Sequence, residues 1–213
     1  MNKIVIIGGG GHSKIVISIL KKIKNYEIMG YTDIQDKGEL LKTGYLGNDK
    51  ILEDIIKSFP GSSAVIGIGN VEVGFKRKIL FEKLENLGFD LPAIISPSAI
   101  INEDVSIAKG TIVCDGVIVN SGSKIGKGVI LNTKCSVDHD CEICDFVHLA
   151  PGVILSGGVT VGNNSFIGAG SIIIQYKKIS ENCLIGAGSI VINDIKERGV
   201  YIGNPAKRVK WST

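Results

Sequence analysis

Aliphatic residues recur at every sixth position through the second half of the chain. From Ile95 to Val191, all seventeen positions of this series are Ile, Leu or Val, without one insertion. Four residues after each of them stands a mostly small side chain, such as Ser123 or Cys135. A fixed period of six residues is typical of a parallel β-helix, in which the large residues fill the interior and the small ones lie beside the corners. We therefore expect a left-handed parallel β-helix over residues 95–213, including a C-terminal cap.

The six-residue period also predicts which residues stack. Three segments close one turn, so positions 18 apart lie on the same side of the coil. Stacked strands lie about 4.8 Å apart, and about five turns then make a coil roughly 25 Å tall. Cys135, Cys141 and Cys183 fall on the small inward position and are expected to be packing residues. Lys177 falls on the same position, and because a buried unpaired lysine is costly we expect a bulge or loop near Gln175–Lys178.

The first 94 residues follow a different pattern, in which short apolar runs alternate with helix-like segments. The expected strands are 3–7, 27–31, 63–68 and 91–94, and the expected helical segments are 12–22, 49–58 and 71–87. Strands that alternate with helices indicate a parallel sheet with helices on its faces. The sequence thus predicts an α/β fold for residues 1–94, a small Rossmann-like domain with about four strands, followed by the all-β coil.

Composition and charge narrow the functional classes. With 44% hydrophobic and 21% charged residues, the chain is typical of a globular protein. A net charge of +3 with interspersed signs gives no basic stripe for nucleic acid. The sequence shows neither an apolar run of about 18 residues nor a secretory cleavage site, so we expect no membrane span, no signal peptide and a cytoplasmic location. Five cysteines, an odd number, argue for reduced thiols.

Two histidines of the coil, His139 and His148, are candidates for chemistry. The repeat predicts that His139 points outward from the middle of one flat side, between Asp138 and Asp140, and that His148 lies at a corner. A carboxylate beside an imidazole fixes its tautomer and raises its basicity, which suits a general base near neutral pH. The competing interpretation is an exposed polar corner without a function. We expect no metal ion, because half a turn separates the two rings.

One column of the coil is almost free of side chains. The stacked segments 149–154, 167–172 and 185–190 contain Ala-Pro-Gly once and Gly-Ala-Gly twice. A bare strip lets an extended ligand such as a pantetheine arm lie against the backbone. The alternative is that glycine and alanine merely suit the corners, but the other two columns carry charges and larger residues.

Three loops of the N-terminal domain follow predicted strands. Gly8–Gly11 precedes a helix and can hold a diphosphate at the helix N-terminus, while Ser13 breaks the dinucleotide fingerprint and makes a nicotinamide cofactor less favoured. Asp33 is placed to accept hydrogen bonds from a ribose or a base. The third loop is Gly67–Asn70. Ligands bind at the carboxyl ends of parallel strands, so the three loops predict one ligand site.

In combination these motifs resemble the bacterial nucleotide-sugar N-acetyltransferases, a family of hexapeptide-repeat acyltransferases. The resemblance covers nearly the whole chain and is strongest to enzymes that acetylate UDP-4-amino-4,6-dideoxy sugars on the way to bacillosamine, and to sialic acid O-acetyltransferases. It rests on Ile-Gly-Gly-Gly-Gly-His at 7–12, Gly-Ile-Gly-Asn at 67–70, Val-Asp-His-Asp-Cys at 137–141, Asp-Phe-Val-His at 145–148 and Gly-Asn-Pro-Ala-Lys-Arg at 203–208.

The resemblance implies an acetyl-CoA-dependent N-acetyltransferase of polysaccharide biosynthesis. It would act on the amino group of a nucleotide-linked 4-amino-4,6-dideoxy sugar, by direct transfer in a ternary complex. It would form a homotrimer with acetyl-CoA between neighbouring coils. His139 matches the general base of the family, and Asp140 matches the residue that orients it. The implied cofactor contacts are His148, Gly157, Ala169 and Ala187, and the implied nucleotide contacts are Gly10, Gly11, His12, Asp33 and Asn70.

Two alternatives stay open from the sequence. An O-acetyltransferase acting on sialic acid or another glycan precursor has the same features. A non-catalytic β-helix scaffold needs neither an outward histidine–aspartate pair nor a bare strip. Where close relatives carry a second acidic residue after the position of Asp33, this chain has Ile34. Whether the nucleotide is UDP, GDP or CMP also stays open.

Overall fold

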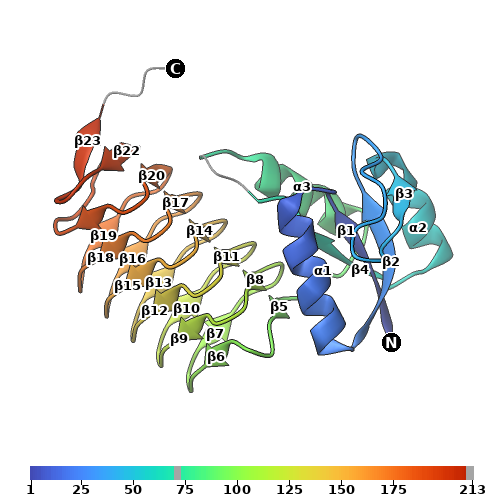
Figure 1. Ribbon diagram of the computed structural model, residues 1–213, viewed down its shortest axis with the longest axis horizontal. Helices are drawn as coiled ribbons and strands as arrows, with labels where there is room; N and C mark the ends of the chain where they lie inside the picture. Colours follow the sequence, from blue (N-terminus) through green and yellow to red (C-terminus); the bar gives the residue numbers. More distant parts are fainter. Residues whose placement is uncertain (70–72, 210–213) are drawn as a thin grey trace.

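The computed structural model describes residues 1–69 and 73–209, and it has the two-part architecture that the sequence predicts (Figure 1). A small α/β part with a four-stranded sheet precedes a left-handed coil of short parallel strands. Within the described residues, no helix has the length and apolar character needed to cross a membrane.

The sheet of the α/β part is parallel, with the strand order β3-β2-β1-β4. Its elements are β1 (Asn2–Ile7), α1 (Gly11–Ile23), β2 (Tyr26–Thr32), β3 (Tyr45–Gly47), the 3-10 turn η1 (Asp49–Ile51), α2 (Leu52–Ser58), β4 (Ser63–Ile66) and α3 (Lys76–Asn86). Alternate residues of a strand face opposite sides. Ile4 and Ile6 of β1 pack with α1 and the coil, whereas Val5 and Ile7 pack with α2 and α3. Helix α1 therefore lies between the sheet and the coil (Figure 1).

One predicted strand of this part is wrong, and one predicted helix begins later than expected. The strand expected at 91–94 is not part of the sheet: Asp90 makes a single bridge to Ser63, and Ile94 already belongs to the coil. The fourth strand of the sheet is instead β3, which is too short to show an alternating pattern. The helix expected at 71–87 begins at Lys76, and the first two positions of that prediction lie outside the described residues.

The coil has three flat sides, each a stack of short strands paired in parallel at intervals of 18 residues. One side holds β5 (Ile94–Ile95), β8 (Ile112–Val113), β11 (Ile130–Leu131), β14 (His148–Leu149), β17 (Phe166–Ile167) and β20 (Cys183–Ile185). The next holds β6 (Ile100–Ile101), β9 (Ile118–Val119), β12 (Ser136–Val137), β15 (Ile154–Leu155), β18 (Ile172–Ile173) and β21 (Ile190–Val191). The third holds β7 (Ser106–Ile107), β10 (Lys124–Ile125), β13 (Glu142–Ile143), β16 (Thr160–Val161) and β19 (Lys178–Ile179).

The outward residues of these strands give each side its character. On the β5–β20 side, Ile94, Ile112 and Ile130 are fully buried, and the first two pack in one core with residues of α1, so we call this the docked side. On the β6–β21 side the outward residues are mostly isoleucines, and we call it the isoleucine side. The β7–β19 side presents Ser, Lys, Glu, Thr and Lys in that order, and we call it the polar side.

The repeat positions fill the interior of the coil as predicted. Val137, Leu149 and Leu155 are fully buried, and the two rows of inward residues form one continuous core. Cys135 and Cys141 are buried in the same core, which confirms that they are packing residues. Burial raises the pKa of both thiols, so they stay protonated.

The bulge expected near Gln175–Lys178 is wrong. Strand β19 pairs with β16 without a shift in register, and the corner residue Tyr176 has a φ of 59° like the other non-glycine corners. Lys177 is only half-buried. Its aliphatic stem can therefore lie against the coil while the ammonium group reaches water.

The chain leaves the repeat through a short hairpin. Strand β22 (Gly199–Ile202) continues the docked side by pairing parallel with β20. Strand β23 (Lys207–Val209) then returns antiparallel to β22. The hairpin covers the end of the coil that lies farthest from the sheet (Figure 1).

Candidate functional site

His139 lies in a corner turn of the coil, between the isoleucine side and the polar side. The turn follows β12, and Asp140 has the left-handed φ of 58° that this corner position requires. The expected place in the middle of a side is wrong, because the strand ends at Val137 and the chain has already turned two residues later. The outward direction is as expected, since the side chain is 52% exposed.

Two carboxylates hold His139. Oδ2 of Asp140 lies 2.9 Å from Nδ1 of the ring. The backbone N–H of His139 donates to Oδ1 of Asp138 at 2.8 Å, and the Asn120 amide donates to the same oxygen at 2.9 Å. The hydrogen bond with Asp140 is the main cause that raises the pKa of His139, and the charges of Asp138 and Asp140 add to it. With Nδ1–H bound to Asp140, Nε2 is the basic nitrogen.

The Nε2 atom of His139 faces Gly157 on the next turn of the coil. A Cβ at Gly157 would lie 2.4 Å from Nε2, a distance that leaves no room for any side chain. The N–H of Gly158 donates to the His139 carbonyl at 2.8 Å and fixes the spacing of the two turns. The structure thus brings together His139, Asp140 and Gly157, which the sequence proposed separately.

The bare strip lies along a different edge, between the docked side and the isoleucine side. Gly152, Gly170 and Gly188 have φ values of 68° or 69°, and a Cβ at any of them would meet nothing within 4 Å. Lys134 occupies the same edge with a φ of 58°. The backbone therefore does not demand glycine at this corner, and the strip is an open surface rather than a folding requirement.

The two edges border the same flat side of the coil. His139 and Gly157 lie along one edge of the isoleucine side, and Ala169 and Ala187 lie along the other edge, beside the glycines of the strip. Within one chain the fold therefore does not bring the imidazole to the strip.

His148 lies in the middle of the docked side, in β14, and not at the corner that the sequence predicted. Its neighbour Leu149 points into the coil, so His148 points outward, yet it is only 5% exposed because the α/β part covers this side. Nε2 lies 3.1 Å from the amide nitrogen of Asn132, and the ring packs edge-on against Phe166 at 5.1 Å.

His12, in the first turn of α1, is turned toward this junction between the two parts. Burial lowers the pKa of His12 to about 3, with contributions from Arg77 and His148, so the ring is neutral. Its Nε2 atom is enclosed without a hydrogen-bond partner. The side chain therefore faces the coil rather than the Gly8–Gly11 loop.

Arg77 of α3 ties the two parts together. Its guanidinium donates to the Ile66 and Ile68 carbonyls of the α/β part and to the Gly128 carbonyl of the coil. Burial lowers the pKa of Arg77 to about 10, so it keeps its charge at neutral pH. Nothing in the sequence pattern singled out this residue.

The glycine loops meet as predicted. The hydroxyl of Ser13 lies 2.6 Å from the Gly8 carbonyl oxygen and 3.0 Å from that of Gly67. The N–H of Gly9 donates to Oδ2 of Asp33 at 2.7 Å. Ser13, the residue that breaks the dinucleotide fingerprint, is thus the link between two of the loops, and the sequence missed this role. Asn70 lies outside the described residues.

The N-terminus of α1 is free to receive an anion. Gly10 precedes the helix without a side-chain cap, and a Cβ at Gly10 or Gly11 would meet nothing within 4 Å. Burial raises the pKa of Asp33, but the N–H groups of Gly9 and Gln35 outweigh that effect, so the pKa is lowered and the carboxylate is charged.

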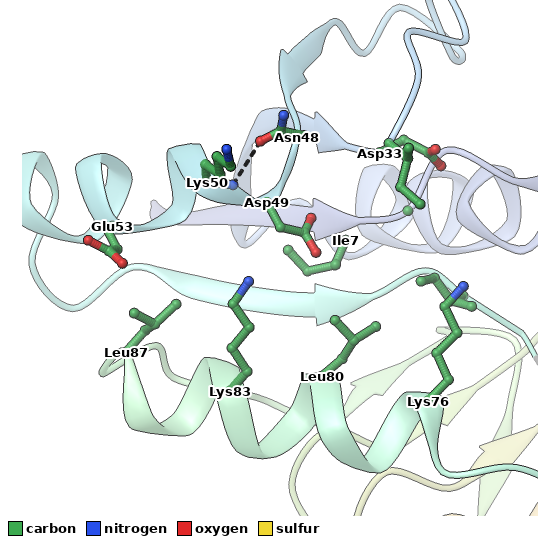
Figure 2. A pocket seen from close by; sticks show the side chains of 13 residues that line it. Ile7, Asp33, Asn48, Asp49, Lys50, Glu53, Lys76, Leu80, Lys83 and Leu87 are labelled. Atoms are coloured by element: carbon green, nitrogen blue, oxygen red, sulfur yellow. Dashed lines mark hydrogen bonds between the residues drawn. The ribbon is translucent and has the colours of Figure 1, made fainter.

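A cleft of about 690 Å³ opens beside these loops, between α2 and α3 (Figure 2). It is lined by Ile7, Gly8, Asp33, Ile34, Asn48, Asp49, Lys50, Glu53, Ile68, Lys76, Leu80, Lys83 and Leu87. The α3 wall and the turn at Asn48–Lys50 were not among the residues predicted from the sequence. Within the described part of the chain, no group of three or more His, Cys, Asp or Glu residues is arranged to hold a metal ion.

Comparison with protein families finds two matches. Residues 3–84 match the PglD N-terminal domain, and residues 140–175 match the bacterial transferase hexapeptide (six repeats). UDP-N-acetylbacillosamine N-acetyltransferase of Bacillus subtilis (strain 168) is 32% identical over 116 residues. This match covers 53% of the present chain and 51% of the relative, so it spans about half the length of that curated protein.

Several solved structures match over nearly the full chain. Perosamine N-acetyltransferase from Caulobacter crescentus, as a histidine-to-asparagine variant in complex with CoA and GDP-perosamine, is 34% identical with a TM-score of 0.92, covering 99% of this chain and 98% of that one. The acetyltransferase domain of PglB from Neisseria gonorrhoeae FA1090, in complex with acetyl coenzyme A, is 32% identical with a TM-score of 0.90, covering 98% and 100%. WeeI from Acinetobacter baumannii AYE is 26% identical with a TM-score of 0.88, covering 98% and 100%.

Proposed function

This chain belongs to the bacterial nucleotide-sugar N-acetyltransferases, and we propose its function from that membership. It transfers the acetyl group of acetyl-CoA to the amino group of a nucleotide-linked 4-amino-4,6-dideoxy sugar. Relatives that were solved with CoA, acetyl coenzyme A and GDP-perosamine support both substrates. The observation that carries the proposal in this chain is the outward His139–Asp140 pair, whose Nε2 faces Gly157.

The proposed reaction is a direct transfer in a ternary complex. The sugar amine attacks the thioester carbonyl, and Nε2 of His139 takes the proton that the nitrogen loses as the C–N bond forms. Asp140 orients the ring and stabilises the imidazolium through the hydrogen bond to Nδ1. Backbone N–H groups near Gly157 stabilise the negative charge that develops on the carbonyl oxygen. The C–S bond then breaks, and the thiolate of CoA takes the proton from the imidazolium of His139.

The test of this mechanism is the His139→Ala variant. Loss of a general base should lower kcat at least about 100-fold, while acetyl-CoA binding measured by calorimetry stays nearly unchanged. Glu103→Ala is the matched control, because Glu103 precedes the corner Asp104 on the same edge, 36 residues earlier and so two turns away. Full activity of the His139 variant would contradict the assignment. Assays with amino sugars and with hydroxyl-bearing analogues separate N-acetylation from O-acetylation.

The isoleucine side supports the proposal of a homotrimer. Ile100, Ile118 and Ile154 point outward from it and are 54%, 38% and 45% exposed. Exposed apolar residues in one row mark an interaction surface. Since His139 lies on one edge of this side and the bare strip on the other, packing of neighbouring copies over it would bring the base of one coil to the strip of the next. Acetyl-CoA would then lie between the coils.

The Ile154→Lys variant tests this assembly. A trimer in sedimentation velocity should become a monomer, and activity should fall with it, because a charge in the contact is costly. Thr160→Lys on the polar side serves as the control and should leave the mass unchanged. A trimer that persists in the Ile154 variant would be evidence for a different contact.

The remaining proposals follow the resemblance. Residues 1–94 hold the nucleotide sugar, and residues 95–213 hold acetyl-CoA and end in a cap; the location is the cytoplasm. The proposed cofactor contacts are His148, Gly157, Ala169 and Ala187, and the proposed nucleotide contacts are Gly10, Gly11, His12, Asp33 and Asn70. The charge of His148 contributes to the lowered pKa of His12, so both lie near the junction of the two parts, where a sugar held by one part would reach a thioester held by the other.

A further inference from the structure

The cleft between α2 and α3 continues beyond the glycine loops that the proposed function uses. Gly8, Asp33 and Ile68 lie at its mouth, at the carboxyl ends of the strands. From there one wall is a face of α3, made by every third or fourth residue over about three turns. The residues of that wall are Lys76, Leu80, Lys83 and Leu87.

The opposite wall comes from the turn η1 and the start of α2. Asp49 is fixed there, because the hydroxyl of the fully buried Thr32 donates to its Oδ1 at 2.7 Å. Figure 2 shows the Asp49 carboxylate directed toward the α3 wall, close to Ile7. Thr32 uses one lone pair of Oδ1, so among the described residues this carboxylate keeps Oδ2 and the second lone pair of Oδ1 for a ligand.

The α3 wall carries two lysines, and the opposite wall carries Asp49 and Glu53 together with Lys50. Among the ion pairs of the described residues, none joins Lys76 or Lys83 of one wall to Asp49 or Glu53 of the other, and the partner of Glu53 is Lys57 at 3.9 Å on its own helix. Figure 2 shows Lys83 extending across the cleft toward Asp49 and Glu53, whereas Lys76 extends at the end of the cleft where Asp33 lies. Ile7 lies between the walls, and Leu80 and Leu87 make the α3 wall partly apolar, so the cleft suits a flat ring with both hydrogen-bond donors and acceptors on its edge.

We propose that this cleft binds guanine, so that the substrate is a GDP-linked amino sugar; this inference rests on the proposed function. Guanine presents the N1–H and the exocyclic amine side by side, and a carboxylate accepts both. Its O6 and N7 atoms are acceptors, which suits the ammonium group of Lys83. Uracil has a single N–H between two carbonyl oxygens, and adenine and cytosine offer only one amine beside ring acceptors. Among these bases, guanine therefore donates the most hydrogen bonds to the Asp49 carboxylate.

The other carboxylate at the mouth does not compete for this role. Asp33 accepts N–H groups of the backbone at both oxygens, from Gly9 at 2.7 Å and from Gln35 at 3.3 Å. Its neighbour Ile34 is 87% exposed and offers no hydrogen bond from its side chain. Neither residue offers a free carboxylate oxygen to the base, so its recognition falls to Asp49.

Calorimetric titration of the full-length protein with GDP, UDP, CDP and ADP tests the inference. GDP should bind at least about tenfold more tightly than the other three, because two charge-assisted hydrogen bonds are made only with guanine. Inosine diphosphate, which lacks the exocyclic amine, should bind more weakly than GDP. Equal or tighter binding of UDP would overturn the guanine assignment and leave the nucleotide-sugar substrate intact. If none of the four binds, the nucleotide-sugar part of the proposed function fails as well.

The Asp49→Asn variant makes the test specific. It keeps an oxygen for the Thr32 hydroxyl but places an amide N–H where guanine has its amine. The variant should lose the preference for GDP and gain binding of xanthosine diphosphate, which has a carbonyl at that position. Asp54→Asn is the control, an exposed residue of α2 outside the cleft, and should keep the preference for GDP. Unchanged acetyl-CoA binding shows that the variants are folded. An Asp49 variant that still prefers GDP tenfold contradicts the proposal.

Discussion

In the coil, the surroundings of a residue follow from its place in the repeat, whereas in the α/β part they follow from contacts between distant segments. The coil repeats one arrangement: its non-glycine corners from Asp104 to Asn182 have φ values between 55° and 59°, and its strands from β5 to β21 pair at intervals of 18 residues. In the α/β part, Ser13 contacts Gly67 and Asp33 contacts Gly9, pairs separated by 54 and 24 residues.

This difference determines how candidate site residues can be recognised in each part. In a regular coil, a candidate functional residue stands out as a departure from the repeat. His139 replaces an ordinary corner residue, Gly157 leaves room for its ring, and the glycine strip omits side chains that other corners carry. In the α/β part no repeat exists, so residues such as Asp49 and Arg77 are recognised only once the chain has folded.

A cavity inside the coil should have the largest effect on stability. Leu149 is fully buried, and it pairs with Leu131 and Ile167 of the neighbouring turns. Leu149→Ala should lower the free energy of unfolding by about 3–5 kcal/mol, measured by urea denaturation. The control Glu142→Ala, on the polar side, should stay within about 0.5 kcal/mol of the original protein. A loss below about 1 kcal/mol for Leu149→Ala would mean that the turns collapse into the gap and that the coil is not rigid.

A change at the junction should have the next largest effect and should separate the two parts. Arg77→Met leaves the carbonyls of Ile66, Ile68 and Gly128 without their donor, which should cost about 2–3 kcal/mol. Hydrogen exchange should show faster exchange in the α/β part than in the coil. Lys78→Met, on the same helix but exposed, is the control. If the backbone amides of both parts exchange equally slowly in the Arg77 variant, the junction does not depend on the hydrogen bonds of Arg77.

The pH dependence of the reaction tests whether His139 is the general base. Asp140 raises the pKa of His139, and a general base works only when it is unprotonated, so the rate rises with pH through that raised pKa. Asp140→Asn should lower the rate about tenfold at neutral pH and move the acid limb of the profile to lower pH. Asp104→Asn, at the same corner position with a φ of 57°, should change neither. An acid limb that stays in place in the Asp140 variant would exclude His139 as the titrating base.

The smallest expected effect concerns the bare strip. Gly170 has a φ of 68°, a conformation that Asn164 and Asn182 adopt at other corners, so Gly170→Asn should cost at most about 1 kcal/mol of stability. The new side chain would nevertheless stand where the pantetheine arm is proposed to lie, and acetyl-CoA should bind several-fold more weakly in calorimetry. Gly116→Asn, on the same edge but three turns away, is the control. Equal affinity in both variants would place the cofactor elsewhere.

The fold of the coil could be predicted because its information is local. The inward rows, the three packing cysteines and the outward direction of His139 follow from counting six residues. Counting six residues did not predict where each strand ends. Each side has only two residues of paired strand per turn, so His139 lies in a corner and His148 on a side. The prediction of a strand at 91–94 was wrong for a related reason: an apolar run does not show which sheet it will join.

By itself, the sequence determined the coil, the α/β character of the first part and the residue types able to perform acetyl transfer. Only the tertiary structure decided that the α/β part covers one side of the coil and buries His148. It also decided that His139 and the bare strip lie on opposite edges of the isoleucine side, and that Asp49 faces Lys83 across a cleft. A repeat fixes contacts between residues 18 apart through strand pairing. Contacts between distant, non-repeating segments depend instead on which surfaces bury each other, and no local pattern records that choice.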